Sequence, residues 1–380
     1  MTGSALMDVC DGCARRSWLV ARLAGHLEKR RGERDTVREV LGLSDARLIE
    51  ALGGLLAGEI AAEHAAMDPA ELRACWTAAG SHAMCRHAAG YPLRLLELPD
   101  APAVLHLRGE PERIAALLAA PLVAIVGARK ASDEGRETAR SLGRGLSAAG
   151  VTVVSGMALG IDAAAHDGAV DAGANSLAVL ACGPEIAYPR SRRALHGRLV
   201  GTGGVLSELP PGTPPFKWAF PARNRIIAAL AELVILVEAA ERSGSLITAD
   251  IAIGLGRDVG AVPGSPLSWR CSGTNQLLRD GATVIRDAVD ALDGITGLAV
   301  GVASLAGAGV AGPTGPRPAP TGLEPRLLRL LEAVEHGSEA VDDLAADAAE
   351  VRTVLGDLTE LELLGLVRRG PGGRYTRVSR

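Results

Sequence analysis

The stretch LVAIVGARKAS, residues 122–132, decides the fold: five apolar residues precede a glycine and then polar residues that can open a helix. Such a run predicts a strand buried on both faces, and the glycine permits a tight turn. The same order recurs downstream, with further strands predicted at 151–155, 176–180, 205–207, 233–238, 258–262 and 282–285. Strands separated by helix-length segments predict a doubly wound parallel α/β sheet of extended Rossmann-like type.

The regions on either side of this pattern differ from it. Residues 1–85 show helical apolar spacing, for example at 41–52, and are predicted to form an N-terminal helical domain. The Rossmann-like domain is assigned to 86–293, and the Ala/Gly/Pro-rich segment 294–322 is assigned as a linker. In 323–380, three helical blocks at 325–334, 340–348 and 351–365 precede two short segments around a Pro-Gly-Gly turn, which predicts a winged helix.

Composition limits the possible functions. The chain has 380 residues, of which 48% are hydrophobic, and a formal net charge of -4, so any nucleic-acid site must be a local basic patch. No uncharged segment is long enough to span a bilayer, and the N-terminus lacks a signal-peptide pattern. The six cysteines follow no secreted disulfide pattern. We therefore expect a cytoplasmic protein.

Ligands of doubly wound sheets bind where strands end and loops enter helices. Glycines, small hydroxyl residues and basic side chains in these loops could hold phosphate, although a plain turn or a helix cap explains each loop as well. The candidate phosphate-binding residues are Gly127, Arg129, Lys130, Ser155, Gly156, Ser243, Gly244 and Ser245.

Asp162 and His166 stand one helical turn apart after the second of these loops. The pair could form an acid–base or metal site, but no third ligand or nucleophile accompanies it. A cap and a helix-face histidine are the favoured interpretation.

A second signal is a cluster of basic and aromatic residues. Between Ile186 and Ala231 the chain has seven Lys/Arg and one acid, and both phenylalanines lie within 216–220 with a tryptophan between them. Basic groups interleaved with rings suit single-stranded nucleic acid, because charge follows the backbone while rings stack on unpaired bases. The alternative is a solvated basic loop anchored by core aromatics. The candidate nucleic-acid-binding residues are Arg190, Arg192, Lys217, Trp218, Phe220, Arg223, Asn224 and Arg225.

Motifs for catalysis are missing from the sequence. It contains no Walker A lysine, no GxSxG, no HExxH and no evident pair of catalytic carboxylates. We therefore expect a binding protein rather than an enzyme, with no catalytic residues, no cofactor and no metal.

Seven stretches together resemble the DNA-processing protein A (DprA, or Smf) family: VAIVGAR, SGMALGIDAAAH, CGPEIAYPR, SELPPGTPPFKWAFPARNRIIAAL, VEAAERSGSLITA, GRDVGAVPG and GTNQLLRDGA. The resemblance implies an extended Rossmann-like protein that binds single-stranded DNA, usually as a homodimer. It also implies a recombination mediator that protects incoming DNA, displaces single-strand binding protein and loads the RecA recombinase during natural transformation. The N-terminal helices are similar to the family's sterile-alpha-motif or helix-hairpin-helix region, and the C-terminus to its winged helix.

The family pattern has departures here. Arg129 matches the arginine of the family's Gly-Ser-Arg loop, but Ala128 replaces the serine, and Arg190 stands where Tyr-Pro-Lys is common. From Leu323 onward the chain has eight Arg and eleven acids, so we expect the winged helix to contact protein rather than DNA.

Two other classes of protein were weighed. A nucleotide-processing enzyme similar to the lysine-decarboxylase-like phosphoribohydrolases would need a Pro-Gly-Gly-x-Gly-Thr motif, which 203–205 and 263–265 do not reproduce. A transcriptional regulator built on the winged helix conflicts with the acidity of that domain.

Four residues have the ligand types of a small zinc site: Cys10, Cys13, Cys85 and His87. The Cys-x-His spacing of the second pair is unusual for zinc, so buried or surface thiols are the favoured interpretation.

Overall fold

The computed structural model describes residues 8–29, 34–296, 323–335, 344, 351–364, 366–369 and 375–377. The chain divides into two compact units, Met1–Gly309 and Val310–Arg380. Most of the predicted linker and of the helical block 340–348, together with the turn of the wing, lie outside the described residues. No helix among the described residues is long and apolar enough to cross a membrane.

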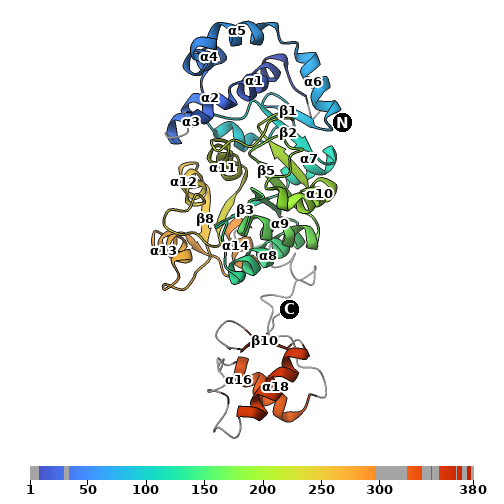
Figure 1. Cartoon of the computed structure of the whole chain (residues 1–380), viewed down its shortest axis with the longest axis vertical. Coiled ribbons are helices and arrows are strands. Elements are labelled where there is room, and N and C mark those ends of the chain that lie inside the picture. The colour runs from blue at the N-terminus through green and yellow to red at the C-terminus, as the bar shows by residue number, and fades with distance from the viewer. Residues whose placement is uncertain are drawn as a thin grey trace. The chain divides into compact units, whose positions relative to one another are not determined.

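The N-terminal region is helical, as the sequence predicts (Figure 1). Its helices are α1 (Asp11–Arg22), α2 (Ala24–Lys29), α3 (Arg34–Leu41), α4 (Asp45–Gly53), α5 (Ala57–Ala66) and α6 (Pro69–Ala78). Apolar side chains of α1 to α5 form a core of their own that also includes Trp218, Ala219 and Ala222 from the α/β domain. The helices are therefore packed on the end of the sheet domain from which Trp218 projects.

A nine-stranded sheet is the centre of the first unit, in the order β1-β2-β6-β5-β4-β3-β7-β8-β9. The strands are β1 (His82–Cys85), β2 (Val104–Arg108), β3 (Leu122–Val126), β4 (Thr152–Ser155), β5 (Ser176–Leu180), β6 (Gly204–Ser207), β7 (Leu233–Leu236), β8 (Asp258–Ala261) and β9 (Thr283–Val284). β3 to β9 are parallel, which confirms the predicted fold class.

The edge next to β6 was not predicted. β2 pairs antiparallel with β6, and β1 pairs antiparallel with β2. The sheet therefore begins at His82, whereas the sequence pattern places the start of this domain at residue 86.

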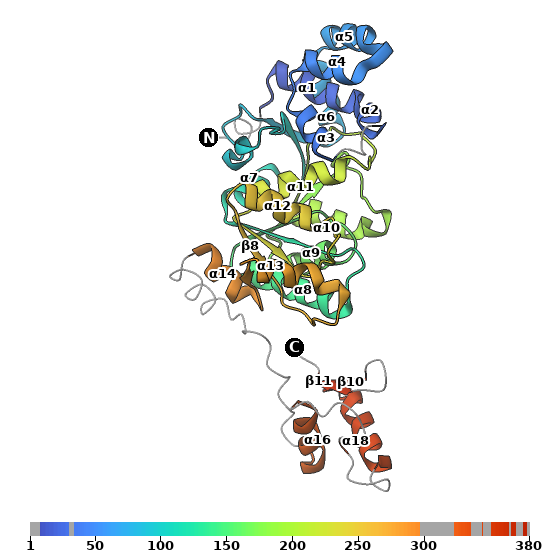
Figure 2. The same cartoon turned by 90° about the vertical axis from the view of Figure 1, so that its left-hand side faces the viewer.

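Helices cover both faces of the sheet (Figures 1 and 2). Leu122, Ala124 and Val126 of β3 pack in one core layer, and Val123 and Ile125 pack in the other, as a strand buried on both faces requires. The first layer contains α7 (Pro111–Ala119), α11 (Ala219–Leu230) and α12 (Leu246–Gly254); the second contains α8 (Asp133–Ala148), α9 (Ile161–Ala172) and α14 (Ala288–Thr296). α10 (Arg193–Thr202) packs against α9 and β6, and α13 (Ser272–Arg279) against β8.

The second unit contains α16 (Pro325–Glu335), α18 (Val351–Leu363), β10 (Val367–Arg369) and β11 (Tyr375–Arg377). The two strands pair antiparallel, as predicted for a wing. Leu327, Leu331, Leu358 and Leu361 form its core.

Candidate nucleic-acid interface

The strand order reverses at β3, which has β4 on one side and β7 on the other. Loops that leave the carboxyl ends of β3 and β7 therefore diverge and form the crevice in which such sheets bind ligands. Here the two loops are tied together: the Ala128 amide donates to the carbonyl of Glu238 (2.7 Å). A Cβ on Gly127 would lie 2.8 Å from that carbonyl, so glycine is needed for the close approach.

The N-terminus of α8 is not open to a phosphate, contrary to the expectation for the Gly127 loop. The buried carboxylate of Glu238 accepts from the backbone N–H of Ser132 (2.9 Å) and from its hydroxyl (2.5 Å). Gly135 leaves room for this carboxylate in the first turn of the helix. An internal anion thus already occupies the positive end of the helix dipole.

The loop after β4 is also occupied by internal protein groups. Ser155 is buried and its hydroxyl donates to the Ile125 carbonyl (2.6 Å). Gly156 is buried as well, and any Cβ there would collide with the guanidinium of Arg223. Arg223 is only 6% exposed and donates to the Val179 carbonyl. The predicted nucleic-acid contacts of Ser155, Gly156 and Arg223 are therefore corrected, because all three residues are buried and support the loop instead of facing solvent.

Asp162 and His166 do not form a catalytic pair. Asp162 accepts from the Gly156 amide (3.1 Å), whereas His166 Nδ1 lies 2.7 Å from the Ser176 hydroxyl. Burial raises the pKa of Asp162, with the nearby Arg223 acting in the opposite sense, and burial lowers the pKa of His166 to about 4. Both residues are therefore buried structural groups, but Asp162 is not the predicted cap, because it lies in the first turn of α9 and the N-cap of that helix is Gly160.

Two residues of the basic and aromatic cluster are also structural. Trp218 is 2% exposed, and its indole N–H donates to the Ala24 carbonyl (3.0 Å), so its ring cannot stack on a base. Arg225 is fully buried and forms ion pairs with Asp100 (2.7 Å) and Glu208 (2.8 Å). Both predictions of DNA contact are wrong, because these side chains join α11 to the N-terminal helices and to the segment before β2.

Three other side chains do meet at the surface. The guanidinium of Arg129 lies over the Phe220 ring, 5.4 Å from its centroid, and the Phe220 and Tyr188 rings are 5.4 Å apart. Arg129 is exposed, Tyr188 is 41% exposed, and Phe220 lies half-buried between them. The loops after β3 and β5 and the start of α11 thus contribute one cation and two rings to a common surface.

Two residues that were not predicted from the sequence, Trp269 and Arg270, extend this surface. Arg270 Nε donates to the Lys130 carbonyl (3.4 Å), and its guanidinium covers the ring of Trp269, 4.8 Å from the centroid. Trp269 is 63% exposed. Both residues follow β8, so the rule that led to the other loops would have found them. We call the connected residues Trp269, Arg270, Lys130, Arg129, Phe220 and Tyr188 the strip.

The remaining candidates lie near the strip or at other loop ends. Lys217 is exposed just before α11, and Asn224 is half-buried in the middle of that helix. Arg190 is exposed and lines a cavity of about 630 Å³ together with Arg108 and Arg193, and Arg192 is half-buried beside it. Ser243 and Ser245 share a hydrogen bond (2.7 Å) across the exposed Gly244, at the N-terminus of α12.

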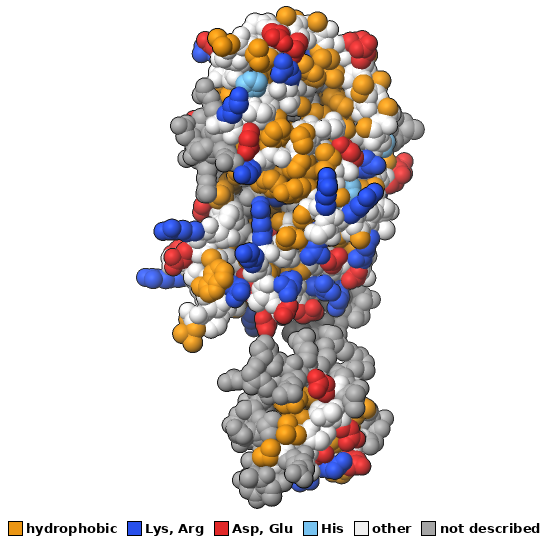
Figure 3. Space-filling view, viewed as in Figure 1, with side chains coloured by type: hydrophobic (Ala, Val, Ile, Leu, Met, Phe, Trp, Pro, Cys, Tyr) orange, Lys and Arg blue, Asp and Glu red, His pale blue; other side chains and the backbone are white. Residues whose placement is uncertain are grey.

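The electrostatics favour an anionic ligand. Among the described residues, no carboxylate forms an ion pair with Arg129, Lys130, Arg190 or Lys217. In Figure 3, Lys and Arg side chains are spread over the lower half of the α/β domain, beside an area of hydrophobic side chains. A net acidic chain therefore presents a local basic surface, as the sequence requires of a nucleic-acid site.

Comparisons with known proteins identify the family of the chain. The sequence model of DNA recombination-mediator protein A matches residues 82–296, and that of the DprA winged helix domain matches 314–373. Protein Smf of Synechocystis is 34% identical over 309 residues, which cover 76% of this chain and 78% of the relative. The DNA processing protein DprA of Streptococcus pneumoniae is 42% identical over 200 residues, 53% of this chain and 69% of that protein.

The fold comparison points the same way. The X-ray structure of DprA from Streptococcus pneumoniae superimposes with a TM-score of 0.60 and 32% identity, covering 73% of this chain and 96% of that one. The chain belongs to the DNA recombination-mediator protein A family.

Proposed function

We propose that the strip binds single-stranded DNA. The observation that carries the proposal is the series of contacts from Trp269 through Arg270, the Lys130 backbone carbonyl, Arg129 and Phe220 to Tyr188, in which three cations lie between the Trp269 ring and the pair of rings Phe220 and Tyr188. Guanidinium and ammonium groups attract successive phosphates, and the exposed rings of Tyr188 and Trp269 offer faces for unpaired bases. A duplex would hide its bases from these rings, so single strands are the favoured ligand.

Family membership supports a wider role, which we include in the proposal. The chain protects incoming single-stranded DNA in the cytoplasm, displaces single-strand binding protein and loads RecA during recombination and natural transformation. It works as a homodimer and not as an enzyme. The winged helix contacts protein, because the eleven acids against eight arginines from Leu323 onward, among them the exposed Glu362 on α18, would repel DNA phosphates.

One structural observation argues against the nucleotide-processing alternative. A nucleotide phosphate in this fold would sit at the N-terminus of the helix after the first parallel strand, and Glu238 fills that position in α8. A carboxylate and a phosphate would compete for the same amides, and their like charges would repel.

The proposal is tested by titrating labelled single-stranded and double-stranded oligonucleotides at two salt concentrations, with nucleoside monophosphate hydrolysis as a control. We expect tighter, salt-sensitive binding of the single strand and no turnover. Turnover of a nucleoside monophosphate without oligonucleotide binding would contradict the proposal.

The RecA step needs its own measurement. RecA nucleation on oligonucleotides coated with single-strand binding protein should accelerate when the chain is added. An unchanged lag at saturating concentrations of the chain would remove this part of the proposal and leave DNA binding intact.

A further inference from the structure

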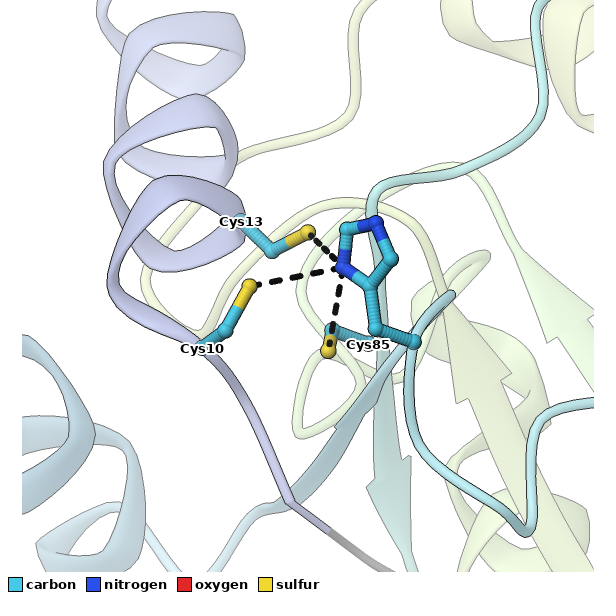
Figure 4. Close-up of side chains that lie close together, drawn as sticks. Cys10, Cys13 and Cys85 are labelled. Carbon is cyan, nitrogen blue, oxygen red and sulfur yellow. Dashed lines mark hydrogen bonds between the residues drawn. The ribbon is translucent and has the colours of Figure 1, made fainter.

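The four residues Cys10, Cys13, Cys85 and His87 lie together, although the sequence left them as separate thiols and a histidine. Their ligand atoms all lie within 4.8 Å of one another. His87 Nδ1 is 3.4 Å from the Cys10 sulfur, 3.4 Å from that of Cys13 and 3.9 Å from that of Cys85; dashed lines mark these contacts in Figure 4. All three sulfurs thus converge on one imidazole nitrogen.

The three sulfur–nitrogen separations are close to the edge length of a metal-centred tetrahedron. With Zn–S bonds of about 2.3 Å and a Zn–N bond of about 2.0–2.1 Å, the sulfur–nitrogen edge is about 3.6 Å and the sulfur–sulfur edge about 3.8 Å. The observed sulfur–nitrogen distances lie on both sides of this value. We propose that these four residues bind one structural Zn²⁺ ion, a site independent of DNA binding.

The donor set identifies the metal and the kind of site. Three thiolates and an imidazole are soft to borderline ligands, which select Zn²⁺ over Mg²⁺ or Ca²⁺. Four protein ligands complete the tetrahedron and leave no position for substrate, as in structural zinc sites. A redox dithiol would need only the Cys10–Cys13 pair and would not require Cys85 and His87 beside it.

The surroundings suit a structural ion. Cys13 and Cys85 are buried in an apolar cluster with Val9, Trp76 and Val104, which shields one side of the site from water. Cys10 and His87 are exposed on the other side, where the ion can enter.

The location indicates what the ion does. Cys10 immediately precedes α1 and Cys13 lies in its first turn, whereas Cys85 ends β1 and His87 follows in the next turn. The chain already approaches β1 here, because the Cys85 amide donates to the Asp8 carbonyl (2.9 Å). The ion therefore links the first helix of the N-terminal region to the edge strand of the sheet.

Metal analysis of the full-length chain, purified under reducing conditions, tests the site. We expect close to one zinc ion per chain, and loss of zinc in Cys10→Ser and His87→Ala. Cys75→Ser is the matched control, because Cys75 is an exposed cysteine on α6 outside the cluster and should leave the zinc content unchanged.

A second measurement remains informative if those variants fail to fold. Co²⁺ added to the metal-depleted chain should produce the visible absorption of tetrahedral cobalt together with a thiolate-to-cobalt charge-transfer band. The variant His87→Cys, which keeps four ligands, should retain binding with a stronger charge-transfer band. A wild-type chain with only trace zinc, without tetrahedral cobalt absorption, or with Cys10 and Cys13 in a disulfide would overturn the proposal.

Discussion

Arg129→Ala is the substitution that most sharply separates DNA binding from folding. Arg129 is exposed, and its guanidinium lies over the Phe220 ring, 5.4 Å from the centroid. An exposed cation–π contact contributes about 0.5–1 kcal/mol, so the free energy of unfolding should change by no more than that. Loss of one phosphate contact should lower the slope of log affinity against log salt by about 0.7 for a single strand.

The expected effect on binding can be worked out from this slope. Raising the salt from 50 to 200 mM lowers the affinity by about 2.6-fold for each phosphate contact. The affinity of Arg129→Ala should therefore fall about 2.6-fold less than that of the wild type over this range. Fluorescence anisotropy with a labelled oligonucleotide at several salt concentrations measures it. Arg144→Ala is the matched control, because this exposed arginine lies near the C-terminus of α8, at the end of the sheet where the parallel strands begin and away from the loops of the strip. Equal slopes for wild type, Arg129→Ala and Arg144→Ala would refute the reasoning.

Further substitutions test the assignments individually. Trp218→Ala should destabilise the fold by about 3–5 kcal/mol in denaturant titrations. Trp269→Ala should leave stability unchanged and weaken single-strand binding by about 1–3 kcal/mol. The reverse pattern would exchange the roles of the two tryptophans. Arg225→Ala should cost about 3–5 kcal/mol of unfolding free energy, because two carboxylates lose their buried partner, and a change below 1 kcal/mol would contradict the ion pairs. His166, with its pKa lowered to about 4 by burial, is neutral in the fold but binds a proton when unfolded below about pH 6.5. Stability should therefore fall as pH drops from about 6.5 towards 4, with this dependence reduced in a folded His166→Asn variant. Deletion of residues 323–380 should leave single-strand affinity within tenfold, and a larger loss would place part of the site in the winged helix.

The sheet could be predicted because its signal is local. The central parallel strands are short runs of mostly apolar residues between turn residues, and the run at β5 coincides with the predicted one at both ends. The antiparallel edge could not be predicted in this way, because the pairing of β2 with β6 and of β1 with β2 depends on tertiary contacts between segments that proline-rich chain separates.

The site was only partly predictable, because counting charges in a segment does not show which way they point. In α11 the residues that are not buried, Phe220, Pro221 and Asn224, follow the three- and four-residue spacing of one helix face. Arg223 and Arg225 fall off that face and are buried. Helical spacing applied to this segment would have separated the two groups, but the partners of Arg225 come from distant parts of the chain and could not be anticipated.

Photo-crosslinking tests the central claim most directly. A single-stranded oligonucleotide carrying iodouracil is irradiated in complex with the full chain, and the adducts are located by peptide mass spectrometry. The strip predicts adducts at Tyr188 and Trp269, the rings exposed beside Arg129 and Arg270. Adducts confined to the helices of residues 11–78 or to the winged helix would contradict it.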